Sequence, residues 1–176
     1  MKRILPIAIS LLALSAGAFA QSPDIDNPLM AAPAQLKAGA TVIKWKPDYT
    51  YDTLKKGTNK LVCYAKPGQR QAFYMECTSM ANLDRVAQNL KFEALGAGSK
   101  AAFDKAEADG TRVKPEFGSV WYHAMGADAE HIRTHMTIAV PMATKATLGL
   151  PEDGKEGGVY IMNAGTTTAH LMTPGE

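Results

Sequence analysis

Two groups of short strand-like segments flank one helical stretch, and this order constrains the fold more than any other feature of the chain. The segments are rich in β-branched and aromatic residues, and glycine or proline stands near the ends of most of them. The first group covers residues 41–46, 60–65 and 71–76, and the second covers residues 119–125, 134–140, 158–162 and 169–173. Connections within the second group are too short for repeated helical crossovers. The order therefore predicts an α+β fold with a mainly antiparallel sheet.

The helical stretch has two parts. Thr78 or Ser79 can cap the first helix, whose apolar stripe consists of Met80, Leu83, Val86, Ala87, Leu90 and Ala94. The other side of this helix is polar and contains Asp84, Arg85, Gln88, Asn89 and Lys91. Residues 99–108 predict a second, shorter helix. We therefore expect one amphipathic helix and one short helix packed on the sheet, with the polar side of the first facing away from it.

The first 20 residues have the pattern of a removable export signal. Two basic residues precede an apolar run at positions 4–14, and alanines at positions 18 and 20 suit a signal peptidase. The run is shorter than the roughly 20 apolar residues that a membrane-spanning helix needs. We therefore expect an exported soluble protein of the periplasm or the extracellular space, with no transmembrane segment after signal removal.

The mature chain predicts one domain with a balanced charge. Removing the first 20 of 176 residues leaves 156, enough for one domain with a hydrophobic core. Residues 21–35 contain three prolines and predict a flexible leader, and residues 36–176 predict a single α+β domain. The signal holds two of the 19 basic residues and none of the 17 acidic ones, so the mature chain has 17 of each. This balance lacks the excess of Lys and Arg that nucleic-acid binding requires, and we expect no nucleic-acid partner.

The two cysteines, Cys63 and Cys77, predict a disulfide bond, because an exported chain enters an oxidising compartment. Cys63 falls inside one expected strand and Cys77 just after the next, so the bond would tie this hairpin to the segment that follows. The alternative is a redox or metal-binding pair. It is the weaker interpretation, because the spacing is not Cys-x-x-Cys and no third ligand lies nearby in the sequence.

All four histidines lie in the final third of the chain, and three of them stand close to a methionine. Residues two apart on a strand face the same way, so His123 with Met125, and His170 with Met172, can each point into one site. Imidazole with thioether is a ligand set that suits copper. The alternative is that the methionines fill the core, while the histidines end strands at the surface or bond a backbone carbonyl.

Other catalytic patterns are weaker. His131 and His135 have the spacing of a zinc-protease helix, but Ile132 replaces the required glutamate and the segment is strand-like. The sequence contains neither a Gly-x-Ser-x-Gly elbow nor a phosphate-binding glycine motif. An apolar cleft between sheet and helix, lined by Trp121 and Tyr160, would suit a small molecule, and a filled core is the alternative. The residues therefore assign no reaction and no cofactor.

Four segments resemble a family of uncharacterised bacterial exported proteins over nearly the whole mature chain. They are the Gly-Thr-Asn turn with its cysteine strand at 56–64, the second cysteine at 75–77, the His-led strand ending in proline at 134–141, and residues 160–172. The chain departs from the family in Thr167, where a proline is usual. The resemblance implies the α+β architecture and no established activity. It also singles out His135 and His170 as matching positions.

These observations lead to two main hypotheses, and a third, a hydrolase with an unrecognised site, would need an acid or hydroxyl within hydrogen-bond reach of His135 or His170. The first is an exported protein that binds a small ligand or a protein partner without catalysis. The second is a periplasmic binding protein for a copper- or zinc-type metal, or a metalloenzyme, that uses His135 and His170 with His123 or Met172.

Overall fold

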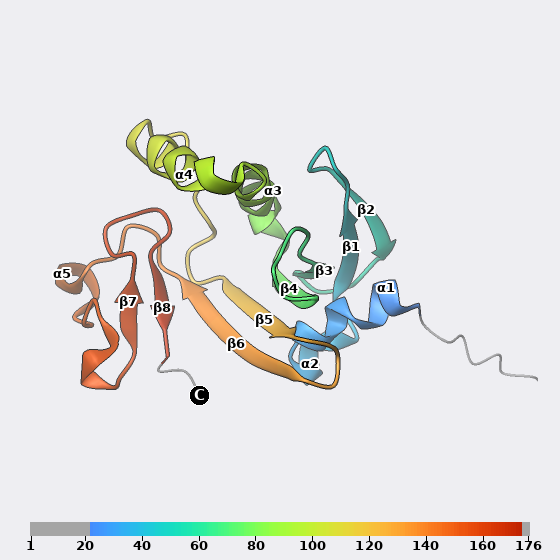
Figure 1. The fold of residues 1–176 in the computed structure, drawn as a ribbon. Helices are drawn as coiled ribbons and strands as arrows, with labels where there is room; N and C mark the ends of the chain where they lie inside the picture. Colours follow the sequence, from blue (N-terminus) through green and yellow to red (C-terminus); the bar gives the residue numbers. More distant parts are fainter. Residues whose placement is uncertain (1–21, 174–176) are drawn as a thin grey trace, which may run out of the picture.

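Eight strands form one mixed sheet in the computed structural model, which describes residues 22–173 (Figure 1). The strands are β1 (Thr41–Trp45), β2 (Tyr51–Lys55), β3 (Leu61–Ala65), β4 (Phe73–Ser79), β5 (Val120–Gly126), β6 (Ile132–Ala139), β7 (Tyr160–Met162) and β8 (His170–Met172). Their order across the sheet is β2-β1-β3-β4-β5-β6-β8-β7. Strands β1 and β3 are parallel, and the other neighbouring pairs are antiparallel. The predicted α+β class with a mainly antiparallel sheet is therefore confirmed.

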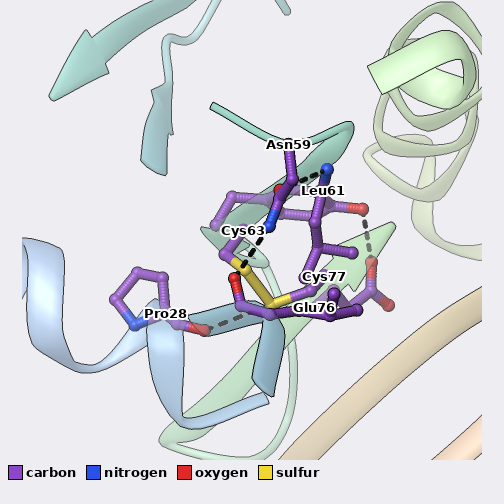
Figure 2. Close-up of a disulfide and its surroundings, with 8 residues drawn as sticks. Pro28, Asn59, Leu61, Cys63, Glu76 and Cys77 are labelled. Atoms are coloured by element: carbon purple, nitrogen blue, oxygen red, sulfur yellow. Dashed lines mark hydrogen bonds between the residues drawn. A yellow bond between two sulfur atoms is a disulfide. The ribbon is translucent and has the colours of Figure 1, made fainter. Parts of the chain in front are cut away.

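Strand β4 extends further than the sequence indicates. It continues to Ser79, so Cys77 lies inside the strand and directly opposite Cys63 of β3. Their Sγ atoms are 2.07 Å apart, the distance of a disulfide bond (Figure 2). The prediction that the bond ties the hairpin to the following segment is wrong, because Thr78 is a buried strand residue and not a helix cap. The bond joins the two strands of the hairpin.

One face of the sheet is covered by α3 (Leu83–Glu93). A short 3-10 turn, η2 (Met80–Asn82), precedes this helix, and the Ser79 side chain caps the turn by accepting from the amide of Ala81. Leu83, Val86 and Leu90 of α3 pack on buried residues of β1 and β3, namely Ile43, Val62 and Tyr64. Helix α4 (Ser99–Ala108) lies beside α3 (Figure 1). Phe103 of α4 meets Phe92 of α3 edge to face, with ring centroids 5.2 Å apart.

The opposite face of the sheet is covered by the segment that the sequence predicts as a flexible leader. Its described residues form α1 (Pro23–Asp26), the 3-10 turn η1 (Pro28–Ala31) and the start of α2 (Ala34–Lys37). Leu29 is only 4% exposed and packs in a core cluster with both cysteines, and the Pro28 carbonyl oxygen lies 3.5 Å from Cys77 Sγ (Figure 2). The leader prediction is therefore wrong for residues 22–35. Two of its prolines begin helical turns, where the missing amide costs nothing.

A third core cluster joins the C-terminal strands to the segment that follows β6. It contains Val140, Ala143, Ile161 and Ala169. The short helix α5 (Lys145–Leu148) and the turn η4 (Gly154–Glu156) connect β6 to β7. Within residues 22–173, no helix is long and apolar enough to cross a membrane. The predicted export signal lies outside the described residues.

Candidate functional site

A cavity of about 240 Å³ lies between α3, the sheet and the start of β8. Side chains on a strand alternate between its two faces, so every second residue of β4, β5 and β6 points to this side. Strand β4 supplies Glu76, β5 supplies His123 and β6 supplies Thr137. Helix α3 adds Arg85 and Asn89, and the residues 168–170 close the far side. The cavity therefore collects polar groups that are far apart in the sequence.

The centre of the site is a row of three side chains on neighbouring strands. Strand register pairs Glu76 with His123, and His123 with His135. His123 Nδ1 lies 3.4 Å from Glu76 Oε1 and 3.5 Å from the Tyr74 hydroxyl. The rings of His123 and His135 stack with centroids 5.9 Å apart. Burial lowers the pKa of His135, and the neighbouring His123 and His170 lower this pKa further.

Glu76 is a buried and ionised carboxylate with three polar neighbours. Its residue is 4% exposed, and the Tyr64 hydroxyl donates to it over 2.8 Å. Lys66 Nζ lies 3.5 Å from Glu76 Oε1 and 3.1 Å from Glu93 Oε1. Burial alone would raise the pKa of Glu76, but the bond to His123 and the charge of Lys66 outweigh it, and this pKa is lowered. The carboxylate is therefore charged and already has partners at neutral pH.

Arg85 is the second buried charge of the cavity. The sequence pattern predicts that it faces away from the sheet, but its residue is only 4% exposed, so this prediction is wrong. Its guanidinium donates to the Val113 carbonyl, to Thr167 Oγ1 over 3.0 Å and to Thr168 Oγ1 over 2.7 Å. All three acceptors are neutral. Burial and the charge of Arg112 lower the pKa of Arg85 to about 10, so it keeps its charge at neutral pH.

A second buried arginine, Arg112, contacts the helix α3 that forms one side of the cavity. Arg112 lies over the Phe103 ring, 4.7 Å from its centroid, and donates to the side-chain oxygens of Gln88 and Asn89. Burial lowers the pKa of Arg112 to about 10. Asn89 and Arg85 form the α3 side of the cavity, so the contacts of Arg112 with this helix hold that side in place.

The four histidines lie in different places relative to the cavity, and not all of them line it. His123 and His170 line the cavity, and His135 stacks beside it. His170 Nδ1 donates to the Thr168 carbonyl over 2.7 Å. Met172 belongs to the same strand as His170 but does not line the cavity. His131 is exposed, with Nδ1 2.8 Å from Asp128 Oδ1.

A metal centre finds less support. Among residues 22–173, no group of three His, Cys, Asp or Glu side chains is placed to hold a metal ion. Structural and catalytic metal sites in proteins are normally built from at least three protein ligands. The stacked imidazoles of His123 and His135 supply two.

The sequence pattern does not identify the charged groups that define the cavity, above all Glu76 and Arg85. A signal for the helix was present. Asn82, Arg85 and Asn89 follow one another at intervals of three and four residues, so they form a polar stripe along one edge of the apolar stripe. Such a stripe at the edge of a buried face indicates side chains that reach over the sheet.

Comparisons with protein-family models, with curated proteins and with solved structures found no match to this chain. The resemblance to a family of bacterial exported proteins therefore stays a prediction, and function has to be argued from the site.

Proposed function

We propose that the mature protein is an exported binding protein that holds a small ligand in the cavity between α3 and the sheet, without catalysing a reaction. The observation that carries this proposal is the convergence of polar side chains from five elements, β4, β5, β6, α3 and β8, on one cavity. Small-molecule sites are typically concave, with a few polar groups that orient the ligand. The volume of about 240 Å³ is below the roughly 300–1,000 Å³ of drug-sized sites, so a small metabolite suits it.

Two observations support export. The first 20 residues predict a signal peptide, and Cys63 and Cys77 are at disulfide distance. Disulfides persist in oxidising compartments such as the periplasm and are rare in the cytosol.

Binding without catalysis is favoured by the contacts of His123. Its polar neighbours in the described chain are a carboxylate and a phenol, Glu76 and Tyr74. Where histidine serves as the base that activates a nucleophile, a serine, threonine or cysteine lies within hydrogen-bond reach of the ring, and the contacts of His123 within residues 22–173 include none. Metal binding is the second candidate, favoured by the stacked rings of His123 and His135.

A fragment screen of the mature chain tests the proposal. Ligand-observed NMR would identify binders in a library of small neutral, anionic and cationic molecules. Thr137→Phe should abolish their binding, because the added ring fills the cavity that Thr137 lines. Thr134→Phe is the matched control, since Thr134 lies on the same strand but faces the other side, where it lines a separate groove.

Amide chemical-shift mapping on the wild-type protein makes the test independent of the variants. Shifts centred on Glu76, Trp121 and His170 would support the proposal, because these residues line this cavity and not the other groove, whereas His123 lines both. A screen without binders, or binders that survive Thr137→Phe and shift residues of the other groove, would overturn it.

A further inference from the structure

We infer that the ligand of this cavity carries a carboxylate, and that Arg85 is the residue that binds it. This inference rests on the proposed function, because it names the chemical class of the molecule in the same cavity. It is argued from the partners of Arg85, from the charges around the hollow and from the shape of its walls.

Arg85 has no carboxylate partner among residues 22–173. In the described part of the chain, its guanidinium donates only to one backbone carbonyl and two threonine hydroxyls, and it forms no ion pair with a carboxylate. A buried charge without a counter-charge is unfavourable unless an opposite charge reaches it. A guanidinium has five N–H donors, so these three hydrogen bonds leave two for a ligand.

Glu107 is the acidic residue whose negative charge acts to raise the pKa of Arg85, against the larger effect of burial. Both oxygens of Glu107 are occupied by Thr167, whose amide donates to Oε1 over 2.6 Å and whose hydroxyl donates to Oε2 over 2.7 Å. Thr167 therefore stands between the two charges. Glu107 accepts two hydrogen bonds from Thr167, and the Thr167 hydroxyl accepts one from Arg85. Glu107 itself forms no ion pair with the Arg85 guanidinium.

Charged residues of both signs line the cavity. Lys66 and Arg85 are the cationic residues of the lining, and Glu76 is its anionic one. Lys66 already lies between two carboxylates, Glu76 and Glu93, and Glu76 also accepts from Tyr64. Glu93 is not among the lining residues, and within the lining the charges of Lys66 and Glu76 balance, so the charge still available to a ligand there is the positive charge of Arg85.

The other lining residues suit the uncharged part of a small carboxylate ligand. Trp121 and Pro115 give the hollow an apolar side. His170 approaches from β8, and because its Nδ1 is bonded to a backbone carbonyl, Nε2 is left for a polar group of the ligand. Arginine binds a carboxylate through two parallel hydrogen bonds, which fixes the orientation of a planar anion. A small carboxylate with an apolar body matches this arrangement.

Matched pairs of small molecules test the inference on the mature protein. Benzoate, butanoate and succinate would be compared with benzamide, butanamide and succinamide by titration calorimetry at constant ionic strength. We expect the carboxylates to bind at least tenfold more tightly than their amides. Arg85→Gln should remove this preference, Arg85→Lys should retain part of it, and Arg70→Gln, at an exposed position, should leave it unchanged.

The comparison of acid with amide uses the wild-type protein, so it stands even if the Arg85 variants do not fold. Equal affinity for the two members of each pair, together with binding that Thr137→Phe abolishes, would overturn the carboxylate assignment and leave the proposed cavity intact. An Arg85→Gln variant that is folded and keeps the preference would also overturn it. Failure of every molecule in the wider screen would instead overturn the proposed function.

Discussion

Removing the Cys63–Cys77 bond should cost the protein about 3 kcal/mol of unfolding free energy. The two cysteines are 14 residues apart in the sequence, and their bond closes a hairpin inside the central sheet. In the chain-entropy treatment, a closed loop of about 15 residues restricts the unfolded state by about 3 kcal/mol. For a chain of this length, 1 kcal/mol shifts the melting temperature by about 2–4 °C. The expected decrease is therefore about 6–12 °C.

Urea and thermal unfolding with and without a phosphine reductant measure this effect. The wild-type protein should lose stability when the unfolded chain is kept reduced. A double variant, Cys63→Ala with Cys77→Ala, should be less stable under both conditions and insensitive to the reductant. Both cysteines are fully buried, so the variant also loses packing, and the effect of reductant on the wild type isolates the bond. Equal stability of the wild type under both conditions would refute the entropic reasoning and the bond itself.

Four further predictions test the buried groups. Glu76→Gln should lower stability at pH 7 by about 1.5–3 kcal/mol, because it removes the buried charge that accepts from Tyr64 and lies beside Lys66, while Glu93 still partners Lys66. Because folding lowers the pKa of Glu76, its charge stabilises the folded state above pH 4.5, the pKa in the unfolded chain. This stabilisation is lost as pH falls through the lower pKa of the folded state, so the unfolding free energy of Glu76→Gln should depend less on pH in that range. The lowered pKa of His135 means that the folded state resists protonation, so stability should fall as pH drops below 6.5, and His135→Gln should reduce this loss. Leu29→Ala should cost about 2–5 kcal/mol in urea unfolding, whereas Leu95→Ala, at a residue that is 56% exposed, should cost less than about 0.5 kcal/mol. Elemental analysis of protein purified from the periplasm should find no stoichiometric copper or zinc, and a metal content that falls in His135→Ala and His170→Ala would favour the metal hypothesis instead.

The sequence pattern predicts the strands that are rich in β-branched and aromatic residues. Alternation of apolar and basic residues from Ile43 to Lys46 predicts β1, and β-branched runs predict the later strands, although the structure buries both faces of β1 at its start. Strand β2 escaped prediction because four of its five residues are exposed, so it has no buried face to create a pattern. It exists through its backbone pairing with β1.

The candidate site was less predictable, because it depends on register and on long-range packing. No local pattern indicates that Glu76 lies beside His123, since that contact follows from the pairing of β4 with β5. Proline content suggested mobility in residues 21–35, yet Leu29 packs against the core formed by distant strands. The sequence predicts histidines as candidates, and their role depends on neighbours such as Arg85 that only the fold brings together.

The NMR signal of the Arg85 Nε–H group tests the central claim most directly. Benzoate added to the mature wild-type protein should shift this resonance, and benzamide at the same concentration should leave it nearly in place. The signal can be assigned by its loss in Arg85→Lys. A resonance that does not respond while benzoate binds elsewhere would contradict the assignment of this cavity as a carboxylate site.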